Sequence, residues 1–520
     1  MIQQPDVTIT RYLADEAATG RFAAELALML AAGDCVCLQG DLGAGKTVLA
    51  RALIAALSPA GAAPEVPSPT FTLVQTYDDT RMPVAHYDCY RLKDADEILE
   101  TSLDDDLRDR LVLIEWPEHI APWLPADRLT VSLAIEGEGR RAIVTAEGAL
   151  RQRLARFEAI AAFLAASDWG DAERNFLMGD ASSRRYERLG RPDGETCLMM
   201  DMPARSDGLP VANGKPYSRL VHLAEDCRAV LAVSGELLRR GYSAPRTLAH
   251  DVSAGLVLME DLGDKTYGRL IAEGEDISEP LLAATMVLAD MAGRPWPHEA
   301  PLPGGGSHRL KTYDTVALLT EAALLIGWFW PLATGRPAAA EIATTYGEAW
   351  SEVLPLAAAE PPVWVLRDYH SPNLIWLPQR EGLARVGLID TQDAVLGHPA
   401  YDLVSLLRDA RLDVPGDVAT DYFDYYCALR EADDAGFERR RFEAAFALFG
   451  AQRAAKVLGI FARLSRRDGK HGYLRHLSRV SGQLEQGLAH PALAPVARWF
   501  AAHLPCSARD AAIAAVTARL

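Results

Sequence analysis

The sequence predicts an α/β protein made of two successive parts, and three observations support this prediction. Short apolar runs alternate with helical patterns through the first 160 residues, which is typical of α/β folds. A glycine-rich turn joins the first clear strand of that part to a helix. Beyond residue 172, a second group of strands precedes a long, mostly helical region. With 520 residues, and about 150 residues per domain, roughly three folding units are expected.

Composition and charge limit the classes of partner. Apolar residues make up 49% of the chain and charged residues 24%, as in globular proteins that bury a core. The formal net charge is −18. This charge argues against direct binding to nucleic acid, which needs clustered positive side chains. Any role with nucleic acid is therefore predicted to be indirect, through other subunits of an assembly.

The cysteines and apolar segments predict a cytoplasmic protein without membrane contact. The seven cysteines form neither a metal-ligand pattern nor a disulfide framework, which favours reduced thiols. Cys35 and Cys37 alternate in "DCVCLQG", so we expect both on one buried face of a strand. The N-terminus "MIQQPDVTIT" lacks a signal-peptide pattern. The run "AALLIGWFWPLA" is shorter than the about 20 residues that cross a bilayer.

The predicted N-terminal domain covers residues 1–160 and contains a phosphate-binding motif. Strands are expected at "DCVCLQG", "VAHYD" and "LVLIEW", a hairpin at "LTVSLAIEGEGRRAIVTAEG", and a closing helix at "ALRQRLARFEAIAAFLAAS". Between the first strand and the helix "KTVLARALIAAL" lies G-x-x-x-x-G-K-[ST]. Its glycines let backbone N–H groups point at a phosphate. The motif residues are Gly40, Gly43 within the loop, Gly45, Lys46 and Thr47.

This motif predicts a P-loop NTPase domain that binds ATP and Mg²⁺. Lys46 supplies positive charge for the β- and γ-phosphates, and the Thr47 hydroxyl can bind Mg²⁺. Asp88, at the end of "VAHYD", is a second predicted metal ligand, directly or through water. Glu115 ends "LVLIE", where parallel strands place functional groups, and is predicted to orient or activate water. Thr70, in "VPSPTFTLV", is either a nucleotide-sensing switch or a solvated loop residue.

Together these segments resemble a known family. "GDLGAGKT", "VPSPTFTLV", "HYDCYRL" and "LIEWPE", in that order and followed by a hairpin, are similar to the TsaE family. That family is the small ATPase subunit of the bacterial tRNA threonylcarbamoyladenosine machinery, and the resemblance covers residues 8–150. It implies ATP turnover when docked on TsaB- and TsaD-like subunits, without direct transfer of the threonylcarbamoyl group. It assigns to the ATP site Gly40, Gly45, Lys46, Thr47, Asp88, Glu115 and Trp116.

The second part carries a different phosphate-handling motif. In "LRDYHSPNLIWL", Asp368 and Asn373 have D-x-x-x-x-N spacing, and Asp390 follows the apolar run of "RVGLID". Kinase-type phosphoryl transfer needs such a set. Asp368 is the predicted base for the attacking hydroxyl, while Asn373 and Asp390 are predicted to hold Mg²⁺ against ATP. Their separation predicts that the two ligands lie on adjacent short strands.

Segments before this motif predict a nucleotide-binding lobe at residues 172–265. "GDASSRRYERL" is expected to cover phosphate with Ser182 and Ser183, in a pair of strands joined at "PDG". "LVLMEDLGD", which contains Glu260, predicts an adenine-binding hinge. Residues 266–520 are predicted to form a helical substrate lobe. From Leu220 onward the chain is expected to be mostly helical, with strands around residues 363–390 as the one interruption. The expected fold is thus a two-lobed, protein-kinase-like domain.

This part resembles the aminoglycoside phosphotransferase superfamily over about residues 172–490. Within it, "GDASSRRYERL", "EDLGD", "RDYHSPNLIWL" and "IDTQDAVLGHPAYDLVSLLRDAR" are similar to bacterial N-acetylmuramate/N-acetylglucosamine anomeric kinases of cell-wall recycling. The resemblance implies ATP-dependent phosphorylation of the anomeric hydroxyl of an amino sugar.

Several assignments remain open in the sequence. Kinases usually carry a lysine that clamps the α- and β-phosphates, but "TCLMMDMP" has none. Candidate replacements are Arg184, Arg185 and Lys215, with Glu225 or Glu236 as the helical acid. Asp402 is expected to be structural, and "PLPGGGSHRL" a flexible loop. Candidates for contacting a charged substrate are Arg463, Arg466, Arg467 and Lys470.

Three functions are compatible with these motifs. The preferred one is a fusion of a tRNA-modification ATPase with an amino-sugar kinase. In the second, the C-terminal part is a degenerate kinase that regulates the ATPase. In the third, the kinase acts on an aminoglycoside or a choline-like alcohol, whose positive charge would favour an acidic pocket over arginines.

Overall fold

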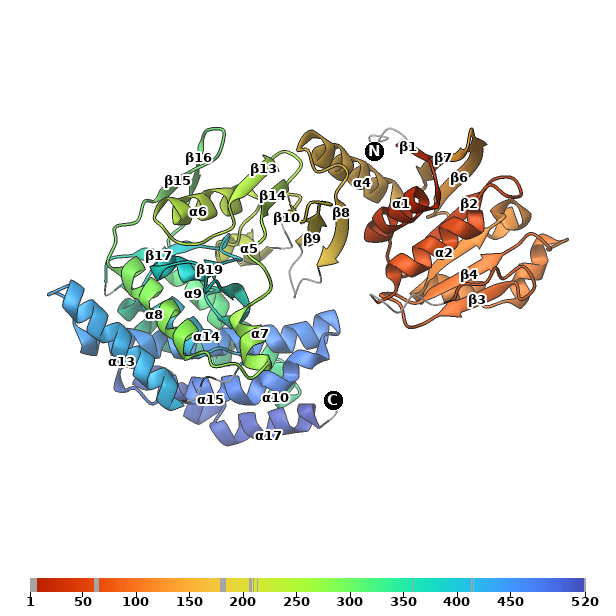
Figure 1. Cartoon of the computed structure of the whole chain (residues 1–520). Helices are drawn as coiled ribbons and strands as arrows, with labels where there is room; N and C mark the ends of the chain where they lie inside the picture. Colours follow the sequence, from red (N-terminus) through yellow and green to blue (C-terminus); the bar gives the residue numbers. More distant parts are fainter. Residues whose placement is uncertain are drawn as a thin grey trace. The chain divides into compact units, whose positions relative to one another are not determined.

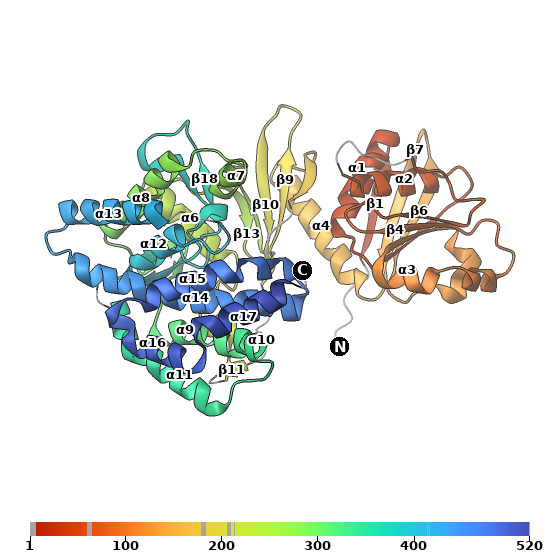
Figure 2. The ribbon, with the colours of Figure 1, turned by 90° about the horizontal axis from the view of Figure 1, so that it is seen from below.

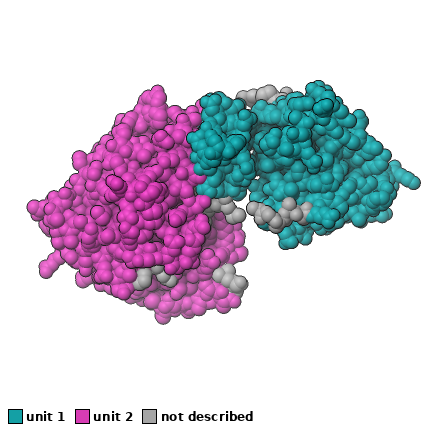
Figure 3. Space-filling model, viewed as in Figure 1, with its two compact units in different colours: residues 1–200 teal, residues 201–520 magenta. Residues whose placement is uncertain are grey.

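The structure is a computed structural model that describes residues 7–59, 65–177, 184–204, 208, 210–212, 214–358, 360–412, 414 and 416–518. The chain divides into two compact units, residues 1–200 and 201–520 (Figure 3). The boundary falls within a single strand, β10 (Thr196–Asp201). The division at residues 160, 172 and 265 stays a prediction.

A seven-stranded sheet forms the N-terminal domain, with the order β1-β7-β6-β2-β5-β4-β3 (Figure 1). The central strand β2 pairs in parallel with β5 and β6, and β4 pairs in parallel with β5. The strands predicted at β2, β4, β5 and the β6–β7 hairpin are therefore confirmed. The strands are β1 (Thr8–Leu13), β2 (Cys35–Gln39), β3 (Val74–Tyr77), β4 (Val84–Asp88), β5 (Leu111–Glu115), β6 (Leu129–Glu136) and β7 (Gly139–Ala146).

Helices cover both faces of this sheet. Figures 1 and 2 show α1 (Glu16–Met29) and α2 (Lys46–Leu57) side by side on one face, with α3 (Leu103–Asp109) on the other. Two apolar cores result. Val36 and Leu38 of β2 belong to the core under α1, α2 and α4 (Leu150–Ala166). Cys35 and Cys37 belong to the opposite core, with η1 (Ala95–Glu100) and η2 (Pro117–Trp123), so their predicted buried, shared face is confirmed.

A five-stranded sheet with the order β13-β14-β10-β9-β8 follows. The expected turn joins β9 to β10, and Gly194 in it has a φ of +89°, a conformation that favours glycine. Two expectations were wrong: β8 is a third strand before the turn, and β13–β14 interrupt a region expected to be helical. The strands are β8 (Glu173–Leu177), β9 (Arg185–Gly190), β10, β13 (Thr247–Asp251) and β14 (Leu256–Glu260).

The rest of the chain is mainly helical, and α14 runs through its centre (Figures 1 and 2). Its elements are β11 (Pro210–Ala212), β12 (Lys215–Pro216), α5 (Tyr217–Leu220), α6 (Arg228–Arg239), α7 (Tyr267–Ala272), α8 (Ser278–Ala292), β15 (Glu299–Pro301), β16 (Ser307–Arg309), α9 (Thr315–Ala322), η3 (Leu325–Phe329), α10 (Trp330–Thr334), α11 (Ala340–Val353), η4 (Leu354–Ala358), β17 (Val363–Val365), η5 (Ser371–Asn373), β18 (Leu374–Trp376), η6 (Gly382–Arg385), β19 (Val386–Leu388), β20 (Val395–Gly397), α12 (Ala400–Leu407), α13 (Gly416–Asp433), α14 (Arg439–Asp468), η7 (His471–His476), α15 (Leu477–Leu488), η8 (Pro491–Leu493), α16 (Ala494–His503) and α17 (Cys506–Thr517).

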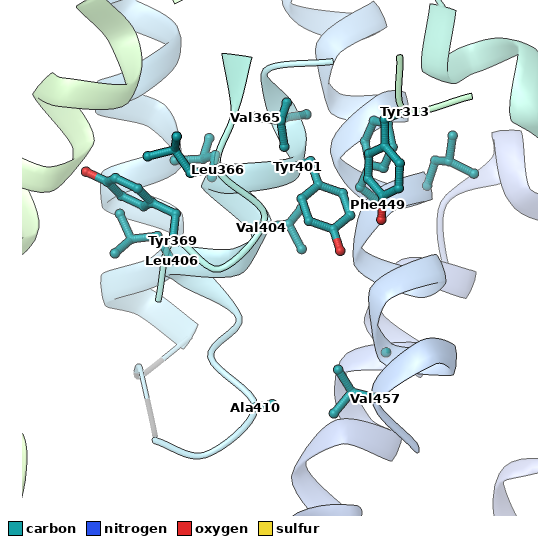
Figure 4. Close-up of a cluster of buried hydrophobic side chains, with 14 of the residues drawn as sticks. Tyr313, Val365, Leu366, Tyr369, Tyr401, Val404, Leu406, Ala410, Phe449 and Val457 are labelled. Carbon is teal, nitrogen blue, oxygen red and sulfur yellow. The ribbon is translucent and has the colours of Figure 1, made fainter. Parts of the chain in front are cut away.

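Aromatic packing joins α12, α14 and β17 into one core. Tyr401 of α12 lies edge-on to Phe449 of α14, with ring centroids 5.6 Å apart, and 5.1 Å from Tyr313 (Figure 4). Val365 of β17 and Leu366 lie in the same cluster. This core therefore fixes the start of the loop that carries Asp368.

Two stretches of this core, Thr315–Thr334 and Arg439–Asp468, are long and apolar enough to cross a membrane. In their most apolar windows, 50% and 83% of the residues are buried inside the fold. Apolar helices that pack inside a protein have the same composition.

The segment "PLPGGGSHRL", expected to be a flexible loop, instead contributes to a hairpin. Glu299–Pro301 pairs antiparallel with Ser307–Arg309. The turn uses Gly304, Gly305 and Gly306, whose φ values are +83°, +111° and +85°. The glycines therefore build a defined turn, because they adopt a conformation that residues with a Cβ rarely do.

Candidate active sites

The glycine-rich turn runs from β2 into α2, where the motif predicted it. Gly40, Gly43 and Gly45 have φ values of +139°, +79° and +104°. A Cβ on Gly40 would lie 2.3 Å from the carbonyl oxygen of Leu133. Glycine is therefore required at this position both by backbone conformation and by space.

Lys46 is held against this turn. Its ammonium donates hydrogen bonds to the carbonyl oxygens of Gly40 (2.6 Å) and Asp41 (3.0 Å). It also lies 3.6 Å from the ring centroid of Trp116, a cation–π contact. Burial lowers the pKa of Lys46, and nearby Glu115 opposes the shift. The ammonium thus has contacts that a phosphate group can replace.

The two predicted carboxylates of this site meet at the carboxyl edge of the sheet. In the parallel pairing of β4 with β5, Asp88 lies opposite Glu115. The Thr47 hydroxyl donates to Glu115 Oε2 at 2.8 Å, and the Thr70 hydroxyl donates to Asp88 Oδ2 at 2.7 Å. The fold therefore brings Thr47, Thr70, Asp88 and Glu115 together, and their roles in hydrolysis remain predictions.

Sequence reasoning missed three residues of this site. His86 is fully buried on β4, with Nε2 2.9 Å from Glu115 Oε1. Its position two residues before Asp88 was an available signal, because alternate strand residues share a face. Tyr90 packs its ring 5.0 Å from that of Trp116. Arg140 of β7 donates to the carbonyl oxygens of Ala44 (3.1 Å) and Gly43 (3.3 Å), a long-range contact that no local pattern indicates.

In the second unit, Asp368 lies on a tightly held loop after β17. The Asp402 carboxylate accepts hydrogen bonds from the backbone N–H groups of Leu366 (2.6 Å) and Arg367 (2.9 Å). Arg367 has a φ of +68°, in the left-handed region, where a non-glycine residue needs support from its surroundings. Asp402 therefore has the structural position expected of it, because it fixes the backbone that orients Asp368.

The two predicted metal ligands lie beside each other. Strands β18 and β19 pair with Leu374 opposite Leu388, which places Asn373 and Asp390 at neighbouring strand ends, as predicted. Asn373 Nδ2 donates to the carbonyl oxygen of Asp368 (3.1 Å) and lies 3.4 Å from Asp390 Oδ2. The fold thus brings Asp368, Asn373 and Asp390 together.

A buried charge network lies behind Asp368, and no local sequence pattern indicates it. Arg367 donates to Glu321, and Lys456 Nζ lies 2.9 Å from Glu321 Oε1. Burial opposes ionisation of Asp368, but neighbouring His370, Lys456 and Arg367 outweigh it and hold its pKa below the ordinary value. Asp368 is therefore a carboxylate at neutral pH, which is the form that accepts a proton.

The hinge residue Glu260 is engaged within the protein. Its Oε1 accepts a hydrogen bond from Arg380 Nη2 at 2.8 Å, and its backbone N–H donates a hydrogen bond to the carbonyl oxygen of Arg246 at 2.8 Å. Next to it, Leu262, Ile375 and Leu377 form a small apolar cluster with Ile389. If this hinge binds adenine, the Glu260 side chain is not the contact. The apolar cluster, missed in the sequence, is the better candidate.

The residues predicted to cover or clamp the phosphates and to contact a charged substrate do not form one site among the described residues. Ser182 and Ser183 lie outside the described residues. Glu236 pairs with Arg240 at 2.6 Å, and Glu225 with Arg219 at 3.8 Å, so each acid already has an arginine partner. Arg185 and Lys215 are exposed, and the phosphate clamp stays unassigned. Among the substrate candidates, Arg463 lies 5.6 Å from the Tyr217 ring and Arg467 pairs with Asp468, while Arg466 and Lys470 are exposed.

The residues present fit Mg²⁺ held together with a triphosphate. Among the described residues, no group of three or more His, Cys, Asp or Glu side chains could hold a metal ion. Mg²⁺ in nucleotide sites is typically bound by one or two protein ligands plus substrate phosphates and water. Asn373 with Asp390, and Thr47 with Asp88, supply that number of oxygens.

Comparisons with known proteins match the N-terminal and C-terminal parts of the chain to two different families. The family model "Threonylcarbamoyl adenosine biosynthesis protein TsaE" matches residues 13–143, and the model "Phosphotransferase enzyme family" matches residues 173–444. An N-acetylmuramate/N-acetylglucosamine kinase of Caulobacter vibrioides is 39% identical over 371 residues, covering 68% of this chain and 98% of that protein. The chain belongs to the phosphotransferase enzyme family.

The N-terminal part of this phosphotransferase-family chain is a TsaE domain. A tRNA threonylcarbamoyladenosine biosynthesis protein TsaE of Rickettsia felis is 40% identical over 129 residues, covering 25% of this chain and 74% of that protein. Among solved structures, ADP-bound aminoglycoside phosphotransferase APH(2'')-Ib is 14% identical, covers 64% of this chain and 97% of its own, and has a TM-score of 0.37. The predicted fusion of an ATPase domain with a kinase-family domain is confirmed.

Asp402 gives the phosphotransferase domain a testable pH dependence. Burial raises the pKa of Asp402 to about 7, although hydrogen bonds from Leu366 and Arg367 oppose the shift. The folded protein therefore keeps a proton that the unfolded chain releases, and stability contributed by this group falls as pH rises from about 4 to about 7. Asp402→Asn should remove this slope. Urea denaturation of the wild type and of Asp402→Asn at about pH 5 and about pH 8 measures this change in the free energy of unfolding. An equal change with pH in the two proteins would contradict the assignment.

Proposed function

We propose that the chain is a bifunctional cytoplasmic enzyme. Its C-terminal part transfers the γ-phosphate of ATP to the anomeric hydroxyl of N-acetylmuramate or N-acetylglucosamine. Its TsaE domain hydrolyses ATP in support of tRNA threonylcarbamoyladenosine formation. The observation that carries the kinase proposal is the convergence of Asp368, Asn373 and Asp390 in a chain 39% identical to a kinase named for these sugars.

The geometry suits phosphoryl transfer to a hydroxyl. Asp368, ionised and held by the Asp402-fixed loop, orients the anomeric hydroxyl and accepts its proton as the oxygen attacks the γ-phosphorus. The bond between the γ-phosphorus and the β–γ bridging oxygen breaks, and ADP leaves. Because the transition state is loose, positioning and proton acceptance late in the reaction suffice. Asn373 and Asp390 would hold Mg²⁺, whose charge would offset that of the phosphates.

The TsaE domain has a parallel assignment. Lys46 would contact the β- and γ-phosphates, Thr47 and Asp88 would hold Mg²⁺, and Glu115 would orient the attacking water. Trp116 covers the nucleotide. Turnover requires TsaB- and TsaD-like subunits, through which the domain acts on tRNA only indirectly. The hydrogen bond from Thr70 to Asp88 supports a loop that senses the metal and nucleotide.

Phosphorus NMR of the reaction products tests the kinase proposal. The full chain is incubated with ATP and Mg²⁺ and with each sugar, an aminoglycoside or choline in separate reactions. A sugar 1-phosphate is expected with the two amino sugars. Phosphate on the aminoglycoside or on choline would redirect the proposal to that acceptor. No transfer to any acceptor would leave the regulatory role.

A further inference from the structure

The Glu115 carboxylate of the TsaE domain is buried and is held by side chains from two other elements. The Thr47 hydroxyl of α2 donates a hydrogen bond to Oε2 at 2.8 Å, and His86 Nε2 of β4 lies 2.9 Å from Oε1. Each oxygen therefore has its own partner. The two partners differ in what else they can do, because Thr47 is a predicted Mg²⁺ ligand and His86 is enclosed in the domain.

The strand register places His86 beside Glu115. In the parallel pairing of β4 with β5, His86 lies opposite Leu113, two residues before the end of β5. Alternate residues of a strand share a face, and Val84 and Leu113 belong to the apolar core under α1 and α2. His86 and Glu115 therefore lie on the face of the sheet that the P-loop helix covers. Two paired strands and a packed core fix the position of the imidazole.

The contacts of the imidazole favour one tautomer. Nδ1 is buried and has no hydrogen-bond partner within the described parts of the chain. With the proton on Nε2, His86 donates to the Glu115 carboxylate and leaves only a lone pair at Nδ1. With the proton on Nδ1, a donor would be buried without an acceptor, and a lone pair would face the carboxylate. The Nε2–H tautomer therefore makes His86 a hydrogen-bond donor to Glu115.

We infer that His86 is a positioning residue for Glu115, and that it holds Oε1 throughout the ATPase cycle. The inference rests on the proposed function of the TsaE domain. When the Thr47 hydroxyl turns toward Mg²⁺, Oε2 loses its donor and becomes free to accept a hydrogen bond from the attacking water. The bond from His86 keeps the carboxylate from rotating with Thr47. His86 retains its proton and acts only through Glu115, so it does not touch the nucleotide.

The first test is ATP hydrolysis by the full-length protein with TsaB- and TsaD-like subunits, and every protein carries Asp390→Asn to silence the kinase domain. His86→Leu should lower kcat by roughly 10–100-fold, the usual effect of losing a hydrogen bond that orients a functional group. KM for ATP should stay within a few-fold. His86→Gln, whose amide N–H reaches about as far as Nε2–H, should restore most of kcat. Gln75→Leu, at the β3 residue paired with His86, is the matched control and should leave kcat unchanged.

A double-mutant cycle separates positioning from a general structural role. If His86 acts only through Glu115, adding His86→Leu to Glu115→Gln should lower kcat no further. Losses that multiply in the double variant would overturn the inference, because His86 would then act on something else. An unchanged kcat in His86→Leu would also overturn it. So would equal losses of kcat and of ATP affinity in both His86→Leu and His86→Gln, since those would indicate a misfolded site.

A measurement without turnover separates this inference from the proposed function. If Glu115→Gln leaves kcat unchanged, the proposed role of Glu115 fails. Nitrogen NMR of the protein labelled at its 12 histidines still reads His86, whose signals are those missing in His86→Gln. The Nε2–H tautomer is expected, both alone and with Mg²⁺ and a non-hydrolysable ATP analogue, and Glu115→Gln should shift its signals. An Nδ1–H tautomer, or signals insensitive to Glu115→Gln, would overturn the inference independently of catalysis.

Discussion

Asp368→Asn is expected to lower kcat for sugar phosphorylation by about 10²–10⁴-fold, the usual contribution of a positioned base. The side chain keeps its size, and the loop keeps both hydrogen bonds to Asp402. An amide cannot take up the proton of the attacking hydroxyl. Affinity for ATP should stay within a few-fold, because Asn373 and Asp390 are unchanged. Steady-state kinetics and a nucleotide-binding titration measure the two quantities.

Asp390→Asn provides the contrast for this experiment. It removes a carboxylate predicted to hold Mg²⁺ against the phosphates, so both turnover and Mg²⁺-dependent ATP affinity should fall. The two variants therefore separate proton acceptance from metal binding. An Asp368→Asn protein with more than about a tenth of wild-type kcat would contradict the base assignment, since typical losses are far larger.

Lys46→Met is expected to abolish ATP hydrolysis by the TsaE domain, with a loss of roughly 10²-fold or more. The variant removes the positive charge predicted to lie at the β- and γ-phosphates, and Arg140 cannot replace it because its hydrogen bonds are made to the P-loop carbonyl groups. The assay is phosphate release in the presence of TsaB- and TsaD-like subunits.

ATP turnover by the kinase domain would add to the phosphate release that is measured. The parent protein and the Lys46→Met variant should therefore both carry Asp390→Asn in addition. Lys93→Met, at an exposed lysine of the same domain, is the matched control and should hydrolyse ATP at the parent rate. Equal hydrolysis by the Lys46→Met and Lys93→Met proteins would show that the P-loop is not the site of turnover.

Local patterns in the sequence were enough to predict the architecture and most of the motif residues. The P-loop spacing, the strand before it and the helix after it lie within about twenty residues and depend on backbone geometry alone. The same holds for Asp368, Asn373 and Asp390, whose two short strands pair as their spacing predicted. Thr47 was found from the same P-loop spacing, whereas Asp88 and Glu115 were found because functional groups gather where parallel strands end.

Contacts between distant segments could not be predicted in this way. Glu321 meets Arg367 and Lys456 only because α9 and α14 pack around β17. Arg140 reaches the P-loop through the register of the β6–β7 hairpin, and Glu260 is engaged by Arg380 from 120 residues away. The segment with the glycines at 304–306 was expected to be a flexible loop, and only the pairing of β15 with β16 makes it a defined turn.

The sequence by itself thus determined which two chemistries the chain carries, since each needs a few residue types at short, fixed spacing. The tertiary structure alone decided how those residues are held and charged. The position of Asp402 under the catalytic loop and the lowered pKa of Asp368 depend on which side chains are buried together. Burial and counter-ions are properties of packing, and packing joins residues that no local pattern connects.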